Sequence, residues 1–205
     1  MAKNPAGLVA LVRVQVIDPA ETDFTDGEIL QYLNQAGRIL HNMIADRRPD
    51  LVQEVKEGDI SVSVPYVTLT RFPRRVRRVR VDGRKVDPGA IPGIADVSET
   101  GRPEYWYMSG FRYVTFSPTP DSTYGVKVFY VPEYAEMVLS GGPCVYPDQA
   151  LDMMVEFAAL RCGLRNEADM SQEAGLFKNF RGEVVTWLSD LTPVPRGEGF
   201  IQPYW

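Results

Sequence analysis

The segment RFPRRVRRVRVDGRK, residues 71–85, combines alternating valines with a high density of positive charge. It holds seven arginines and one lysine against one acid, Asp82, in a chain whose formal net charge is −5. Val79 and Val81 lead into Asp82-Gly83, a dipeptide favoured in two-residue hairpin turns whose central residues both need positive φ. The segment therefore predicts a β-hairpin with a strongly basic surface.

Strand geometry leaves two interpretations of the arginines open. On a regular strand alternate residues share a face, so neither face is purely basic: Val76, Arg78 and Arg80 on one, Arg77, Val79 and Val81 on the other. Charged edge strands keep a sheet from pairing with its copies, which is the first interpretation. The second is a surface for phosphates. Sequence-specific DNA reading is not expected, because no basic recognition helix or zinc module accompanies the run.

The residues around this hairpin continue the period of two. Three segments alternate in this way: DISVSV with Ile60, Val62 and Val64, YWYMSGFRYVTF around Ser109-Gly110, and STYGVKVFYVP with Tyr124, Val126, Val128 and Tyr130 on one side. Alternate aromatics between 105 and 113 are expected to pack in the sheet core. Residues 59–132 thus predict a small antiparallel sheet with proline-rich loops.

Helical patterns flank the sheet on both sides. In DFTDGEILQYLNQAGRILHNMIADRRPD, Thr25 and Glu28 form a capping box, Phe24 can pack against Ile29, and Pro49 limits the helix. The apolar stripe of this helix comprises Ile29, Leu30, Leu33, Ala36, Leu40, Met43 and Ile44. After Gly141-Gly142-Pro143, one helix is expected to begin near Pro147 and Asp148, and a last one near Asp169.

These patterns predict an α+β protein, in which N- and C-terminal helices form a helical bundle with an inserted small antiparallel β module. The expected divisions are 1–57, the N-terminal helical part; 58–135, the β module; 136–190, the C-terminal helices; and 191–205, an extended arm. The arm ends on Phe200, Ile201, Tyr204 and Trp205. Aromatic side chains are costly to leave in water, so the arm either folds back on its own domain or docks into a neighbour's groove.

Composition and charge narrow the class of protein. An apolar fraction of 44% with 24% charged residues is typical of a globular protein, and two cysteines, Cys144 and Cys162, are too few for a disulfide framework. We expect reduced thiols, with Cys162 buried on a helix. The stretch from Leu8 to Ile17 is too short for a membrane span, and we expect no export signal or anchor. Residues 71–85 carry +7 and the remaining chain −12, an asymmetry that suits steering toward phosphate or an acidic protein surface.

Catalytic motifs are missing from the sequence. His41 follows Leu40 off the main apolar stripe and is interpreted as a surface or boundary residue, since no nucleophile motif accompanies it. The acids from Asp18 to Glu28 fail the spacing of an EF-hand loop, so helix entry explains them better. No Walker loop, GxSxG or HExxH occurs. We expect no enzyme, no cofactor and no metal.

In order along the chain, the motifs resemble the head-to-tail adaptor, or connector, proteins of tailed bacteriophages. The matching residues run from about Asp18 to Met170: FTDGEILQYLNQAGR, RPDL, FPRRVRRVRVDGR, GRPEYWY, VTFSPTPDSTYGVKVFYVP and YPDQALDMMVEFAALRCGLRNEADM. The resemblance implies a virion structural protein, made in the bacterial host cytoplasm, that forms a ring under the portal, commonly of twelve copies. Tail or nozzle proteins attach to such a ring, and DNA passes through its channel without specific binding.

The resemblance also suggests roles for two sets of residues. Arg74, Arg75, Arg77 and Arg78 are expected to contact neighbouring subunits or the tail, with lining of the DNA channel as the second choice. Phe200, Ile201, Tyr204 and Trp205 match by position the carboxy-terminal arms that dock on the portal or a neighbour. The alternative function is a non-specific nucleic-acid-binding module using the arginine hairpin, and an unrecognised hydrolase is a third class that no motif supports.

Overall fold

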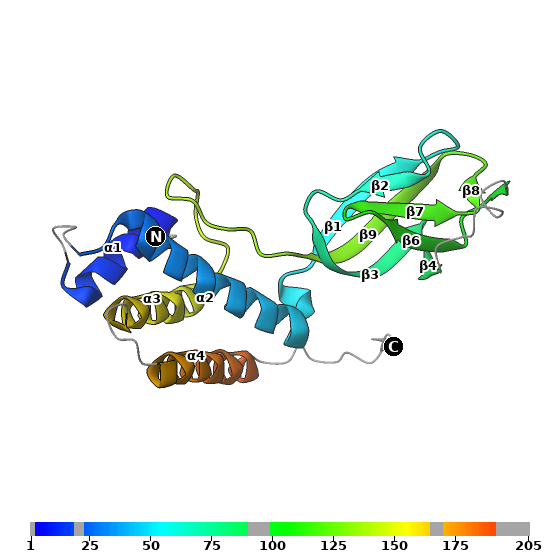
Figure 1. The fold of residues 1–205 in the computed structure, drawn as a ribbon. Coiled ribbons are helices and arrows are strands. Elements are labelled where there is room, and N and C mark those ends of the chain that lie inside the picture. Colours follow the sequence, from blue (N-terminus) through cyan, green and yellow to red (C-terminus); the bar gives the residue numbers. More distant parts are fainter. Residues whose placement is uncertain (1–2, 19–22, 90–98, 165–169, 192–205) are drawn as a thin grey trace. The chain divides into compact units, whose positions relative to one another are not determined.

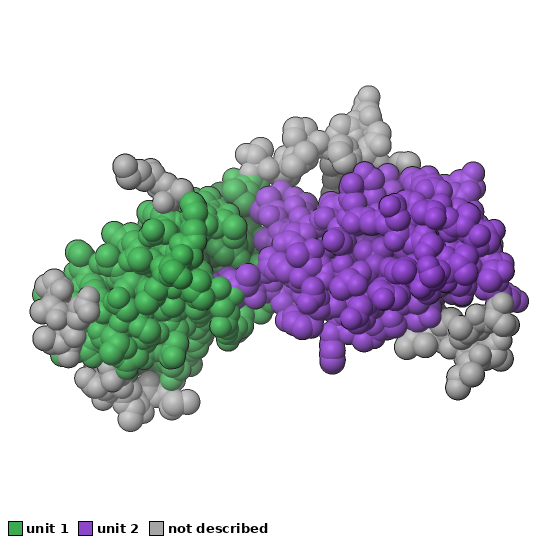
Figure 2. All heavy atoms as spheres, turned by 90° about the horizontal axis from the view of Figure 1, so that it is seen from above, with its two compact units in different colours: residues 1–47, 136–205 green, residues 48–135 purple. Residues whose placement is uncertain are grey.

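A computed structural model describes residues 3–18, 23–89, 99–164 and 170–191. The chain divides into two compact units, coloured in Figure 2. Residues 1–47 and 136–205 form the helical unit, and residues 48–135 form the barrel unit.

The helices and strands follow the chain in the order shown in Figure 1. Their bounds are α1 Pro5–Val16, α2 Asp26–Arg47, the 3-10 turn η1 Pro49–Leu51, β1 Glu54–Ile60, β2 Tyr66–Thr68, β3 Pro73–Val81, β4 Arg84–Pro88, β5 Thr100–Gly101, β6 Tyr105–Ser109, β7 Tyr113–Ser117, β8 Thr119–Pro120, β9 Tyr124–Pro132, α3 Asp148–Gly163 and α4 Met170–Asp190.

The barrel unit is built on a seven-stranded sheet with the strand order β1-β9-β3-β4-β6-β7-β2. Its neighbouring strands run antiparallel except for β4 and β6, which pair in parallel. The two outermost strands, β1 and β2, are joined by a tight turn in which the Ser61 and Val64 backbones exchange hydrogen bonds of 3.0 and 3.1 Å. The sheet therefore curls back on itself into a nearly closed barrel.

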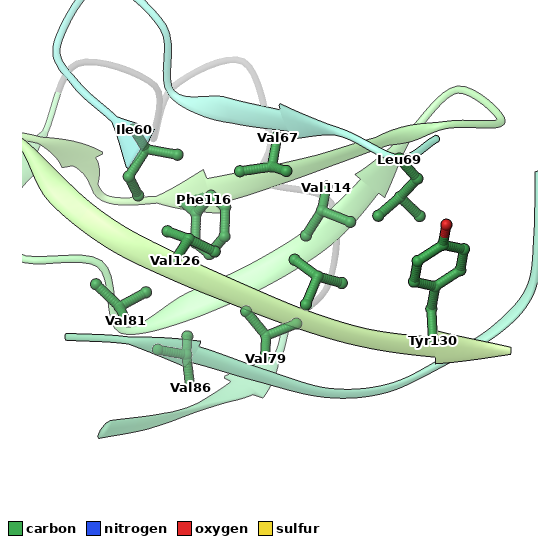
Figure 3. Packing of buried hydrophobic residues seen from close by; sticks show 11 residues of the cluster. Ile60, Val67, Leu69, Val79, Val81, Val86, Val114, Phe116, Val126 and Tyr130 are labelled. Carbon is green, nitrogen blue, oxygen red and sulfur yellow. The ribbon is translucent and has the colours of Figure 1, made fainter. Parts of the chain in front are cut away.

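The interior of the barrel is filled by its own side chains. Figure 3 shows buried residues from facing strands pointing into this interior. The cluster comprises Ile60, Val67, Leu69, Val79, Val81, Val86, Val114, Phe116, Val126, Val128 and Tyr130. The expected inward face of β9 is confirmed, since Val126, Val128 and Tyr130 all belong to this core.

Both expected hairpins are present, and each turn has the backbone geometry that its residues favour. Asp82 and Gly83 connect β3 to β4 with φ of 46° and 79°, the positive pair that a two-residue turn of this hand needs. Gly110, with φ of 73°, connects β6 to β7. In both places the short-range signal was sufficient, because turn chemistry depends on the turn residues themselves.

In the helical unit, α3 contacts α1, α2 and α4. The ring centroid of the buried Phe157 on α3 lies 5.4 Å from that of Phe177 and 4.9 Å from that of Phe180, both on α4. Arg161 of α3 forms an ion pair of 2.6 Å with Glu173 of α4. Aromatic packing and this ion pair together join α3 to α4.

The start of α2 confirms the expected capping box. The Thr25 backbone N–H donates to Glu28 Oε2 at 2.9 Å, and the Glu28 N–H donates to Thr25 Oγ1 at 3.3 Å. Each residue satisfies a backbone donor that the first turn of a helix would otherwise leave unpaired. The helix ends at Arg47, two residues before Pro49, as the proline predicts.

A buried ion pair joins α1 to the entry of α2. Arg13 and Asp18 are 6% and 2% exposed, and their side chains meet at 3.1 Å between Nη1 and Oδ2. Arg13 Nε also donates to Asp26 Oδ1 at 3.0 Å, while the carboxylate of Asp18 accepts the N–H of Phe24 at 3.1 Å. The acids of this segment therefore hold a guanidinium and a backbone turn.

The expected fold class, a helical bundle with a small inserted β module, is wrong. The molecule is a nearly closed seven-stranded barrel together with four described helices. A small open sheet needs helices to cover its apolar face. Here the curled sheet covers that face with its own opposite strands, so the β part carries an independent core of eleven buried residues.

Three local expectations also fail. Val62 and Val64 do not continue a strand: Val62 lies inside the tight turn after β1 and Val64 closes it, and they are 56% and 42% exposed. His41 is buried, at 4% exposure, and its Nδ1 lies 2.9 Å from the Tyr146 hydroxyl. Residues 1–57 were expected to be the N-terminal helical part, but no separate helix was predicted over α1, which the Asn4 side chain caps by accepting the Gly7 N–H at 2.8 Å. By contrast, Cys162 is buried on α3, as expected.

Candidate functional site

Strand β3 carries the arginine run between β9 and β4, and it is not a regular strand. Its register with β9 shifts between Pro73 and Arg75 and again between Val76 and Arg78, so Arg74 and Arg77 are the extra residues of two β-bulges. The second bulge resets the alternation. Val76 thus joins Val79 on the inner side, packed against the core. The expected sharing of one face by Val76, Arg78 and Arg80 is wrong for this reason.

Arg78 and Arg80 project from the outer side of the sheet with residues of β1, β9 and β4. Two cross-strand rows can be read from the register: Val55, Phe129 and Arg78, then Glu57, Lys127, Arg80 and Lys85. We call these seven residues, together with Asp87, the arginine face. It contains four cations and two carboxylates, so its net charge is +2.

Acidic residues neutralise some cations of the arginine face and leave others uncompensated. Lys127 forms an ion pair with Glu57 at 2.7 Å, and Lys85 forms one with Asp87 at 2.8 Å. The Arg78 guanidinium lies 6.0 Å from the centre of the Phe129 ring, a cation–π contact that does not cancel its charge. Arg80 is exposed and has no acidic partner among the described residues. The excess positive charge therefore belongs to Arg78 and Arg80.

Arg77 has a different environment from its neighbours. It is partly buried, its Nη1 donates to Gln53 Oε1 at 2.9 Å, and its Nε is buried without a hydrogen-bond partner among the described atoms. Burial, followed by the nearby charge of Arg75, lowers the pKa of Arg77. Arg74 and Arg75 are exposed farther along β3. Of the four predicted arginines, Arg78 thus belongs to the arginine face and Arg77 is partly buried, and Arg80, which was not among them, belongs to the face.

A second polar group lies at one end of the barrel, and no local sequence pattern indicates it. Arg71 Nη1 donates to Glu54 Oε1 and the Tyr130 hydroxyl donates to Glu54 Oε2, both at 2.8 Å. Burial, and then the hydrogen bond to Glu54, raises the pKa of Tyr130. These partners are 17 and 76 residues apart in sequence. Both oxygens of the Glu54 carboxylate accept a hydrogen bond, so this polar group stabilises the end of the barrel.

Other predicted features receive less support from the geometry. The arm residues Phe200, Ile201, Tyr204 and Trp205 lie outside the described residues. Within the described ranges no cluster of three or more histidines, cysteines or acids has the geometry to hold a metal ion. None of the described helices has both the length and the apolar character that crossing a membrane requires.

The chain belongs to the SU10 adaptor protein family, whose sequence profile matches residues 4–195. This confirms the resemblance to phage head-to-tail adaptors and assigns the chain a structural, adaptor role in a bacteriophage virion. A search of curated proteins finds no match to the chain.

Proposed function

We propose that this chain is the head-to-tail adaptor of a tailed bacteriophage, which forms a ring of identical copies under the portal protein. The ring gives the tail or nozzle protein its attachment platform and leaves a central channel through which DNA passes. The family match over residues 4–195 carries the proposal. Residues 71–85 carry a net charge of +7 and the rest of the chain −12. This asymmetry supports contacts between identical copies, because complementary charges favour ordered association.

Sedimentation of the chain with the purified portal protein tests this function. We expect the two proteins to sediment together as one species that is larger than the portal assembly alone. A mixture in which the chain stays at the top of the gradient at every salt concentration contradicts the proposal. Salt must be varied, since it weakens attraction between exposed charges, and at 0.1 M charges more than about 10 Å apart are largely screened.

Within this proposal residues 191–205 form a docking arm. Phe200, Ile201, Tyr204 and Trp205 are its apolar side chains, and they suit a groove on the portal or on a neighbouring copy.

The second candidate function is non-specific binding of nucleic acid by the arginine face. The exposure of Arg78 and Arg80, without an acidic partner for Arg80 among the described residues, favours it. Filter binding across a salt series is the test. Binding that weakens steeply with salt, and is lost in the variant R78A/R80A, supports this function. The absence of any affinity at low salt excludes it.

A further inference from the structure

The helical unit contains an open groove along α3 and α4, with a volume of about 730 Å³. Met153 and the nearly buried Trp187 provide apolar surface in it. Its charged lining consists of Glu156, Glu183, Asp190 and Lys178. Three acids and one base give the groove a net charge of −2, so it offers an apolar surface with acidic groups around it.

Two carboxylates of this groove lack a cation of their own. Glu156 and Glu183 are exposed, and neither has a hydrogen bond or an ion pair with any residue that the structure describes. Burial, and then the charge of Glu156, raises the pKa of Glu183. A cation that approaches both carboxylates relieves the repulsion between their like charges. The groove is therefore suited to an incoming cation.

The arginine face has the complementary properties. Its net charge of +2 is opposite to that of the groove, and Arg78 and Arg80 are long enough to reach carboxylates across an interface. Val55, at 48% exposure, lies in the same row as Arg78 and adds apolar surface. Arginine beside aromatic and aliphatic groups is characteristic of protein interfaces.

We propose that the arginine face of one copy of this chain binds the α3–α4 groove of the next copy, with Arg78 and Arg80 facing Glu156 and Glu183. This inference rests on the proposed ring function. A nucleic acid would fit the arginine face but be repelled by the groove, and a basic protein would fit only the groove. A second copy of the chain satisfies both surfaces at once. Two different surfaces repeated from copy to copy form a heterologous contact, the type that closes into rings.

Charge reversal on each side tests the pairing. The variant R78E/R80E changes the face from +2 to −2, and E156R/E183R changes the groove from −2 to +2. Each variant alone is expected to raise the concentration for half-maximal assembly on the portal by about tenfold or more, since like charges brought together at an interface oppose binding. Mixing the two variants is expected to restore assembly, because each reversed surface then meets a reversed partner.

Charge-matched controls separate this contact from net charge. The variant R47E/R102E also replaces two exposed arginines and also removes one arginine–ring stack, that of Arg102 over Tyr124 at 5.8 Å. The variant E99R/E104R changes two exposed glutamates on the barrel unit. Both are expected to assemble like the unmodified chain. Circular dichroism melting curves establish that all four variants are folded.

The outcomes distinguish the inference from the function on which it rests. If the unmodified chain does not assemble on the portal, the proposed function fails and the inference falls with it. If it assembles, and the reversal variants behave like the controls or the mixture restores nothing, the pairing of these surfaces is refuted while the function stands. A loss of DNA or tail binding in R78E/R80E with unchanged assembly assigns the face to that other partner and also refutes the pairing.

Discussion

Replacing Val128 with alanine tests whether the barrel is an independently packed core. Val128 is fully buried in the middle of β9, where it pairs with Lys56 of β1 and Val79 of β3. The substitution removes two methyl-sized groups at about 0.8 kcal/mol each, and the space that they leave raises the expected loss of unfolding free energy to about 2–3 kcal/mol.

The matched control is Val55→Ala on the neighbouring strand. Val55 is 48% exposed on the outer side of the same sheet, so its truncation is expected to cost about 0.5 kcal/mol or less. Urea unfolding gives the two free energies, and native-state hydrogen exchange of the β9 amides reports the barrel unit separately. Equal, small losses in the two variants would refute the assignment of the inward face of β9 to the core.

Three further predictions concern other parts of the chain. Asp18→Asn is expected to lower the unfolding free energy in urea by about 3 kcal/mol, because it neutralises the buried carboxylate beside Arg13 and leaves Asp26, at the edge of the site, as the remaining described acid that contacts the guanidinium. A smaller combined loss in R13M/D18N than the sum of the single variants would confirm the coupling, and simple additivity would contradict it. Gly83→Ala is expected to destabilise the protein by about 1 kcal/mol, because Gly83 has a φ of 79°. Gly175→Ala, inside α4 with open space for a Cβ, is expected to stabilise it by a similar amount. Melting temperatures that move in the same direction for both variants would contradict the backbone conformations assigned to the two glycines. Deletion of residues 197–205 is expected to leave the melting temperature unchanged and to impair assembly on the portal; a melting temperature several degrees lower would mean that the arm packs on its own chain.

Short-range signals were sufficient for those elements whose geometry is decided by neighbouring residues. The capping box of Thr25 and Glu28 and the turn at Asp82-Gly83 involve partners within three residues of each other. Such patterns are visible in one sequence because the interacting atoms are fixed by local backbone geometry. The inward alternation of β9 belongs to the same class.

Features that depend on distant pairing were not visible. The strand order of the barrel depends on pairs such as β1 and β9, whose paired residues Glu54 and Tyr130 are 76 positions apart. The bulge at Arg77 needs the partner strand to define it, and without it Val76 was assigned to the face of Arg78 and Arg80. The buried His41 has its Nδ1 2.9 Å from the hydroxyl of Tyr146, 105 residues away. In each case the environment of the side chain is decided by tertiary contacts, which the local spacing of apolar residues does not encode.

Helix α1 was missed for a different reason. Leu8 and Val12 are buried, while Val14 is 73% exposed, so the apolar residues surround the helix and give no one-sided stripe. The cap by Asn4 and the proline at the first helical position were the available signals.

The most direct measurement of the central claim is a cryo-electron microscopy map of the chain bound to its portal protein. The account predicts a closed ring of identical copies below the portal, each with a barrel unit and a helical unit, and with an open channel along the axis. A map that shows a single copy, or copies bound without closing a ring, would contradict it.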